Sequence, residues 1–315
     1  MTSSETLPAL AVSGVARCLP DRIVDVHAWA ARCDFGSQRI ASLMANGVQC
    51  FHDAAGESPV VLATQAVSSL LGATHTAPQA IDALVYAHTF QTSVIAPPAG
   101  SAHRIQSDTG LDRALAFSVS QQNCVSPLAA VHVLQALMAG NSPIERAIVV
   151  CADVIASGCD HLRAIHELAL HSDGACALLL ERGGSRNRIA GLHLYTDASA
   201  FRAMDDDMQP VPDDRYYWSA FATMRAALGQ AGISGREVGH VLPHHVSLPG
   251  WRRLMTMLGI AQERLFTRNF ERTGHVFGAD PFINFNDCED RAPGDWSLLF
   301  SSGLARCFGA MVIHH

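Results

Sequence analysis

Lysine is absent from this chain of 315 residues, and all 22 basic residues are arginines. A chain without lysine cannot form a Schiff base with a carbonyl substrate, and it cannot supply the lysine of a P-loop or of a protein kinase. A formal net charge of -7 without a run of basic residues also argues against nucleic acid as a partner. The missing residue type and the charge together remove several classes of enzyme and one class of partner.

Long apolar runs are also missing, although hydrophobic residues make up 49% of the chain. No stretch approaches the roughly 18 uninterrupted apolar residues of a membrane-spanning helix. The first residues, Met1 to Glu5, contain neither the basic segment nor the apolar segment of a signal peptide. We therefore expect a cytoplasmic globular protein of one large or two fused domains that does not engage a membrane.

Cysteine usage excludes a disulfide framework. The nine cysteines form no Cys-x-x-Cys pair, and an odd number cannot be fully paired. His161, His166 and His171 are spaced by five residues, which rotates them off a common helical face and disfavours a metal site. We expect reduced cysteines, no metal ion and no permanently bound cofactor.

One thiol stands apart from the others. Cys124 lies between the apolar run 114–119, which is typical of a buried strand, and an apolar helical stretch with Pro127 in its first turn. Free N–H groups and the helix dipole at such a position favour a thiolate and a negatively charged tetrahedral intermediate. The segment therefore indicates covalent acyl chemistry on Cys124, whereas the alternative for a lone cysteine is a small buried side chain that fills the junction.

Short apolar runs alternate with helix-like stretches along the chain. The runs expected as strands are 81–88, 114–119, 146–153, 175–181, 189–196, 238–243, 296–301 and 307–313; the expected helices are 99–108, 123–140, 214–231, 248–258 and 280–288. This order predicts a mostly parallel sheet with helices on its faces. A strand ending in histidine, at His88 and again at His244, starts a similar series in each half. We predict an internal duplication into halves 1–170, with Cys124, and 171–315, with the candidate histidines.

Two histidines follow the pattern of a ligand site. His244 ends an apolar strand, and the carboxyl ends of such strands are where α/β folds bind ligands. His275 lies between Gly274 and Gly278 in a tight turn. Asp280, followed by Pro281, is typical of an N-cap residue that opens a helix, with a catalytic role as the alternative.

Several motifs occur in an order that is similar to one enzyme family. They are Ile105-Gln106, Ala116-Phe117-Ser118-Val119, the Cys124 segment, Val149-Val150-Cys151-Ala152-Asp153-Val154, Ser172-Asp173-Gly174-Ala175, Leu242-Pro243-His244-His245, Gly274-His275 and Phe308-Gly309-Ala310. Together they resemble the β-ketoacyl-acyl-carrier-protein synthase III branch of the thiolase superfamily. The resemblance spans nearly the whole chain. It implies an α/β fold of five layers, αβαβα, a homodimer, and acyl transfer through a thioester on Cys124.

The reaction depends on where the chain departs from the family. The synthases carry Cys, His and Asn, and the Asn stands in Gly-Asn-Thr-Ser, which reads Gly274-His275-Val276-Phe277 here. The preferred interpretation is an acyltransferase with Cys124, His244 as base and Asp280 orienting His244, which passes the acyl group to an alcohol or amine. The alternative is a decarboxylating ketosynthase in which His244 and His275 stabilise an enolate.

The donor site also differs from the family pattern. The tryptophan and arginine with which family members hold coenzyme A have no counterpart in the matching stretch 41–45. Trp251, Arg252 and Arg253 instead are candidates for contacting a phosphopantetheine arm or an acidic carrier protein. The resemblance also places an oxyanion hole at the backbone N–H groups of Cys124 and Leu304.

The expected substrates are an acyl thioester of coenzyme A or of acyl carrier protein and a small-molecule acceptor, in fatty acid, polyketide or other secondary metabolism. A further alternative is a non-catalytic partner subunit of a synthase heterodimer, because some members of the superfamily have that role. The presence of Cys124 and His244 argues against this alternative.

Overall fold

The computed structural model describes residues 9–140, 142–200, 211 and 214–315. The strands are β1 Leu10–Cys18, β2 Ile23–Asp25, β3 Cys50–His52, β4 Ala83–Ala87, β5 Leu115–Val119, β6 Arg146–Asp153, β7 Ala164–Ile165, β8 Ala169–Leu170, β9 Gly174–Arg182, β10 Arg188–Thr196, β11 His240–Leu242, β12 Trp296–Gly303 and β13 Cys307–His314. The α-helices are α1 Val26–Arg32, α2 Ser37–Ala45, α3 Pro59–Thr74, α4 Ser101–Asp108, α5 Ser126–Leu137, α6 Tyr216–Ala231, α7 Leu248–Leu258, α8 Arg268–Thr273 and α9 Asp280–Asp287.

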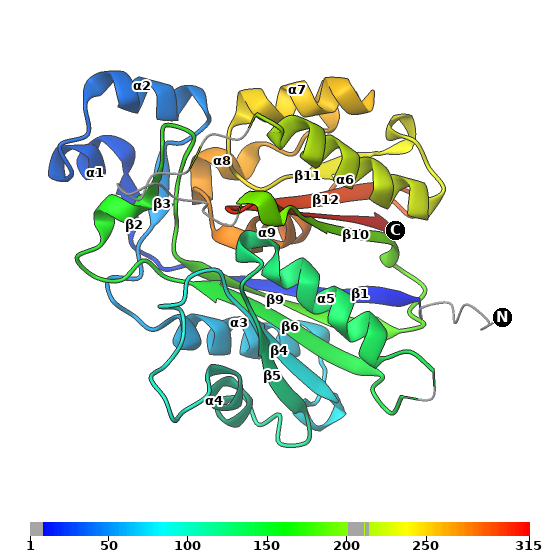
Figure 1. Ribbon diagram of the computed structural model, residues 1–315. Coiled ribbons are helices and arrows are strands. Elements are labelled where there is room, and N and C mark those ends of the chain that lie inside the picture. Colours follow the sequence, from blue (N-terminus) through cyan, green and yellow to red (C-terminus); the bar gives the residue numbers. More distant parts are fainter. Residues whose placement is uncertain (1–8, 141, 201–210, 212–213) are drawn as a thin grey trace.

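Two sheets lie between three layers of helices. One sheet has the order β1-β9-β6-β4-β5, the other has the order β11-β12-β13-β10, and one residue pair, Ala11 with Arg188, joins them. Helices α5 and α9 each contact strands of both sheets, whereas α3 and α4 cover the outer face of the first sheet and α6 covers that of the second. Figure 1 shows the layers, with α3 and α4 below, α5 and α9 in the middle and α6 and α7 above.

The two sheets repeat one topology. The sequence β1, β4, β5, β6, β9 corresponds to β10, β11, Leu265, β12, β13, in which the third strand is reduced to a single parallel bridge between Leu265 and Val241. Helices α3, α4 and α5 occupy the places of α6, α7 and α9. Because β9 pairs with β1 and β6, the division between the halves falls between β9 and β10 rather than at residue 170.

Strand direction differs from the expectation. Pairs β4–β5, β4–β6 and β11–β12 are parallel, but β1–β9, β6–β9, β10–β13 and β12–β13 are antiparallel. The expected mostly parallel sheet is therefore wrong, and both sheets are mixed. The short connection from Gly303 to Cys307 can join only antiparallel strands, since a parallel pair needs a crossover of a dozen or more residues.

Hydrophobic burial follows the layers. The largest core lies between the two sheets around α5 and α9, where Leu128, Val131 and Phe282 are each at most 1% exposed. Separate cores lie under α3 and under α6 with α7. No helix among the described residues is long and apolar enough to cross a membrane. The central core fixes α5 and α9, and these two helices carry the site.

Candidate active site

Cys124 lies in a sharp turn between β5 and α5. Gln121 and Asn123 both adopt left-handed backbone conformations, with φ of 67° and 49°, and a short 3-10 turn over Asn123–Val125 leads into α5 at Ser126. Asparagine tolerates this conformation better than most residues, which explains its place before the thiol. The predicted helix 123–140 thus begins three residues later than expected, and Cys124 stands just ahead of its first turn.

The thiol is buried and protonated at rest. Cys124 is 6% exposed, and its Sγ lies 3.8 Å from His275 Nε2 and 3.8 Å from Thr89 Oγ1. Burial, and then the nearby Asp153, raise the pKa of the thiol. The expected thiolate at the helix N-terminus is therefore wrong for the resting protein, because desolvation outweighs the dipole. A neighbouring base must remove the proton.

Asp280 is the hub of the site. Its carboxylate accepts hydrogen bonds from His275 Nδ1 at 2.5 Å, from the backbone N–H of Val276 at 2.6 Å and from the backbone N–H of His245 at 2.6 Å. His245 Nδ1 lies 3.1 Å from the second carboxylate oxygen. Burial raises the pKa of Asp280, but the two adjacent imidazoles lower it by more, so the net shift is well below the usual range. The carboxylate is ionised and fully satisfied.

The expected pairing of Asp280 with His244 is wrong. Asp280 orients His275, and His275 in turn faces the Cys124 thiol, so the series runs Cys124, His275, Asp280. Asp280 is the first residue of α9, and that helix start faces the His275 turn and the backbone of His245. Asp280 is not an N-cap either, because Ala279 holds the cap position without a side-chain bond.

His244 belongs to the same site but has other neighbours. Its Nε2 lies 3.3 Å from Ser302 Oγ and 3.4 Å from Tyr216 Oη, and its ring centre is 6.2 Å from that of His275. Burial, and then the positive potential of His275, lower the pKa of His244 to about 3, so the ring is neutral. Its Nδ1 is buried without a hydrogen-bond partner among the described atoms.

Trp251 does not reach a donor substrate from where it lies. It is 1% exposed, and its indole N–H donates to the backbone carbonyl of His244 at 2.9 Å. Its expected role as a pantetheine contact is wrong, because an aromatic ring at this buried turn of α7 supports His244 instead. Arg252 and Arg253 are exposed on the same helix, and the Arg253 guanidinium lies 4.3 Å from the centre of the Tyr217 ring.

The second strand ending approaches the nucleophile from the other side. Asn123 Nδ2 donates to the Leu304 carbonyl at 2.7 Å, and Ser301 Oγ donates to the Cys124 carbonyl at 2.8 Å. A Cβ on Gly303 would lie 2.4 Å from Asn123 Cβ and 3.1 Å from the Cys124 nitrogen, so only glycine fits there. This places Cys124 and Leu304 next to each other, and their shared oxyanion hole stays a prediction.

The sequence analysis missed His245 and Asp153. His245 is 2% exposed and bonds Asp280, Gly274 and Asn284. Asp153 accepts the backbone N–H groups of Thr89 and Phe90, which holds that loop beside the thiol, and burial raises its pKa to about 7. The His-His doublet was the one available signal for His245, whereas nothing local marked Asp153.

Aromatic rings enclose the thiol. Phe277 has a left-handed φ of 50°, which is strained for a bulky residue, and it packs beside Cys124. The ring of His171 stacks on Phe277 at 4.3 Å and on His275 at 5.3 Å. Within the described part of the chain, no cluster of three or more His, Cys, Asp or Glu side chains could hold a metal ion. The residues present suit acid–base and nucleophilic chemistry.

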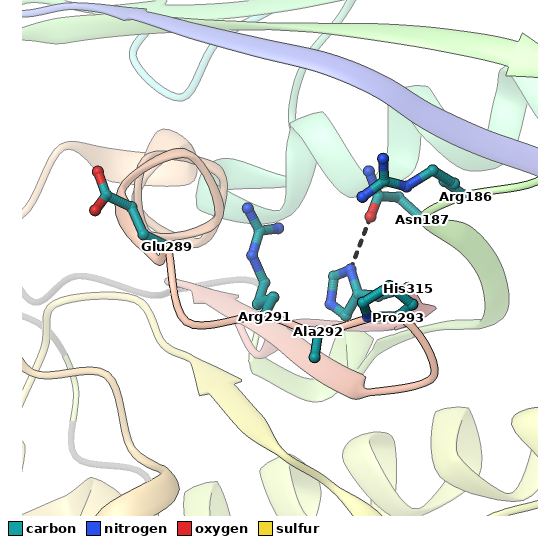
Figure 2. A pocket seen from close by; sticks show the side chains of 7 residues that line it. All are labelled: Arg186, Asn187, Glu289, Arg291, Ala292, Pro293 and His315. Atoms are coloured by element: carbon teal, nitrogen blue, oxygen red, sulfur yellow. Dashed lines mark hydrogen bonds between the residues drawn. The ribbon is translucent and has the colours of Figure 1, made fainter.

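A surface cavity of about 120 Å³ lies elsewhere. Its lining residues are Arg186, Asn187, Glu289, Arg291, Ala292, Pro293 and His315 (Figure 2). Pro293 precedes β12, whose far end at Gly303 adjoins Cys124, so the length of a strand of eight residues, about 25 Å, separates cavity and thiol. The cavity is not part of the site around Cys124.

Comparison with known proteins supports this arrangement. Residues 120–198 match the 3-oxoacyl-[acyl-carrier-protein] synthase III family, and residues 228–315 match its C-terminal region. A β-ketoacyl-[acyl-carrier-protein] synthase III of Ruegeria sp. strain TM1040 is 27% identical over 324 residues, covering 96% of this chain and 98% of that protein.

Solved structures share the fold at low identity. The synthase III of Aquifex aeolicus VF5 superposes with a TM-score of 0.80 at 19% identity, over 97% of this chain and 100% of the other. The acyltransferase ChlB3 superposes with a TM-score of 0.82 at 18% identity, over 98% of each chain. These likenesses confirm the expected thiolase-like αβαβα fold. The two family matches cover more than half of the chain, and the protein therefore belongs to the 3-oxoacyl-[acyl-carrier-protein] synthase III family.

Proposed function

We propose that this protein is an acyltransferase that takes an acyl group from a coenzyme A or carrier-protein thioester onto Cys124 and passes it to an alcohol or amine. In this proposal Cys124 is the nucleophile, His275 is the base, and Asp280 orients His275. The observation that carries the proposal is the series of contacts from the Cys124 thiol through both ring nitrogens of His275 to Asp280.

The proton positions on His275 favour a base. An ionised carboxylate only accepts hydrogen bonds, so the 2.5 Å contact places a proton on His275 Nδ1. The neutral ring then carries its lone pair on Nε2, which faces the Cys124 sulfur. A histidine that stabilises an enolate must donate from the nitrogen that faces the substrate. Neutral His275 cannot do so in this arrangement, and it can accept a proton.

The first half-reaction loads the enzyme. The Cys124 proton moves to His275 Nε2 as the sulfur attacks the thioester carbonyl, and the C–S bond of the donor breaks. The departing thiolate takes the proton back from His275 and leaves as free thiol. The backbone N–H groups of Cys124 and Leu304 would stabilise the tetrahedral oxyanion.

The second half-reaction releases the acyl group. His275 Nε2 takes the proton of an acceptor hydroxyl or amine, the acceptor forms the new ester or amide bond, and the bond to Cys124 breaks. The Cys124 thiolate recovers its proton from His275. Neutral His244, held by Trp251 and next to Ser302, is placed to orient the acceptor. Donor docking on Arg252 and Arg253 and a homodimer remain part of the proposal.

A decarboxylating ketosynthase is the second candidate, because two imidazoles lie on one side of the thiol. The ring centres of His244 and His275 are 6.2 Å apart, and His244 is neutral. This candidate requires malonyl-thioester as second substrate and carbon dioxide as product.

Intact-protein mass spectrometry with a panel of short acyl-thioesters tests the proposal. The wild type should gain one acyl mass, Cys124→Ala should gain none, and alcohols or amines should remove the label. Cys159→Ala is the matched control, because Cys159 is partly buried in the same small cluster as Cys124. His275→Ala should slow both half-reactions at least about 10²-fold. Carbon dioxide release from malonyl-thioester at the rate of acyl consumption would instead establish the ketosynthase.

A further inference from the structure

His245 is a buried histidine that the proposed reaction does not use. It is 2% exposed, and both its ring nitrogens and its backbone N–H contact acceptors. The ring does not face the thiol, because its neighbours are Asp280, Gly274 and Asn284. The identity of these partners determines how many protons the ring holds.

The Nε2 side of the ring carries a proton. His245 Nε2 lies 2.9 Å from Asn284 Oδ1, and the orientation of that amide is fixed because Asn284 Nδ2 donates to the Pro243 carbonyl at 2.7 Å. A flipped amide would bring two oxygens together at that distance. Asn269 Nδ2 donates to the same Asn284 oxygen at 3.0 Å, which again requires an acceptor there. An acceptor at 2.9 Å implies N–H on His245 Nε2.

The Nδ1 side carries a proton as well. His245 Nδ1 lies 2.7 Å from the backbone carbonyl oxygen of Gly274, which can only accept, and 3.1 Å from the Asp280 carboxylate. Gly274 has φ of 64°, and a Cβ there would lie 2.9 Å from the Cys50 carbonyl, so this carbonyl is held in place by a backbone that glycine alone suits. Two acceptors around Nδ1 exclude a lone pair on that nitrogen.

We propose that His245 is a permanent imidazolium whose positive charge balances Asp280 and thereby leaves His275 with a single proton, ready to act as base. His245 is in this sense a positioning residue, since it acts on the thiol only through Asp280 and His275. The role in catalysis rests on the proposed function, whereas the protonation state of His245 does not.

The charges around the ring are consistent with this state. Burial lowers the pKa of His245, but Asp280 and the hydrogen bonds raise it by more, so the net shift is upward. Among the described residues, the titratable groups facing His245 are Asp280 on α9, the neighbouring His244, and His275, which shares the Asp280 carboxylate. Asp287 lies one residue further, where it accepts from Asn269 at 3.0 Å. The remaining contacts, with Thr273 and Phe270, are uncharged.

Loss of the imidazolium should change the pH dependence of His275. An unbalanced carboxylate 2.5 Å from His275 Nδ1 would favour a second proton on that ring. A doubly protonated His275 cannot accept the thiol proton. A removed charge at this range changes a titration by about one unit or more, which is about tenfold in rate per unit at the acid side of the profile.

Neutron diffraction from the unmodified protein tests the protonation state without any substrate. Nuclear density for deuterium on both ring nitrogens of His245, and on Nδ1 alone of His275, is the expected result at neutral pH. A bare nitrogen on His245 would overturn the proposal and would leave the acyltransferase proposal intact.

The kinetic test uses His245→Gln, which keeps an amide donor and removes the charge. The acid limb of the pH profile for thioester formation on Cys124 should move up by about one unit or more, with recovery of the rate at higher pH. His240→Gln is the matched control, because His240 pairs with Asp295 at 3.4 Å outside the site and its loss should leave the profile unchanged.

A uniform fall in rate with an unmoved profile would mean that His245 is merely structural, and an unchanged rate and profile would refute the coupling. If no thioester forms on the wild-type protein at all, the acyltransferase proposal fails, and the neutron result still decides the charge of His245.

Discussion

Asp280→Asn is the substitution that separates a catalytic network from an ordinary helix start. The Asp280 carboxylate accepts four donors within 3.1 Å, two from backbone and two from imidazole rings. An asparagine keeps one acceptor oxygen and turns an N–H group toward donors that it cannot satisfy. It also removes the negative partner of the buried His245.

The magnitude follows from the burial. Asp280 is 0% exposed, and leaving a buried charge without its partner costs about 3–5 kcal/mol. A capping role would predict almost no change, because asparagine caps helices about as well as aspartate. Catalysis should fall too, because a mispositioned His275 cannot take the proton from the buried thiol; loss of a triad carboxylate can cost up to about 10⁴-fold. Both thioester formation and acyl transfer should be slowed.

Two assays measure this prediction. Urea denaturation at neutral pH gives the free energy of unfolding, and quenched-flow mass spectrometry gives the rate of acylation. Asp25→Asn is the matched control, because Asp25 is a true N-cap that accepts from His27 and Ala28 at the start of α1. The reasoning is refuted if Asp280→Asn lies within about 0.5 kcal/mol of wild type, as the control should, and acylates at the wild-type rate.

Two further predictions concern neighbours of the thiol. In Gly303→Ala the new Cβ would lie 2.4 Å from Asn123 Cβ, so we expect a stability loss of about 1–3 kcal/mol and slower labelling of Cys124 by mass spectrometry; Gly72→Ala, with open space in α3, should be stabilising by about 0.5–1 kcal/mol, and equal behaviour of the two would contradict the packing argument. Burial and then His275 lower the pKa of His171 to about 3, so the unfolded chain takes up a proton below about pH 6.5 that the folded protein refuses, and stability is lost as the pH falls from about 6.5 to 3. His171→Gln should flatten that part of the stability profile in denaturant titrations, and an unchanged slope would show that His171 does not contribute.

Local sequence signals located the nucleophile well. The apolar run before Cys124 and Pro127 after it predicted the strand, the turn and the helix, because each depends on residues near in sequence. The same holds for β6, at Arg146–Asp153, and for α7, at Leu248–Leu258, whose predicted and observed limits agree. Strand direction could not be read in this way, because it depends on which distant strand lies alongside.

The partner of Asp280 was equally out of reach of the sequence. His244, His245 and His275 are all near Asp280 or its strand, and only the direction of each side chain tells which rings reach the carboxylate. The backbone turns after Pro243, so that His245 N–H bonds Asp280 and the His244 ring lies between Trp251 and Phe300. A general base at the end of the strand was a sound expectation, yet the base that faces the thiol comes from the loop before α9.

The departures from the synthase pattern depend on one another. Family synthases have asparagine where His275 stands, and an amide at that place has no second nitrogen to connect a carboxylate with the thiol. Histidine at 275 becomes a base only if Asp280 fixes its proton on Nδ1. Asp280 in turn would hold a second proton on His275 unless a cation balances it, and His245 is the buried group placed to do so. A single reversion, His275→Asn, would therefore leave a balanced ion pair with no base, and would not by itself restore a ketosynthase.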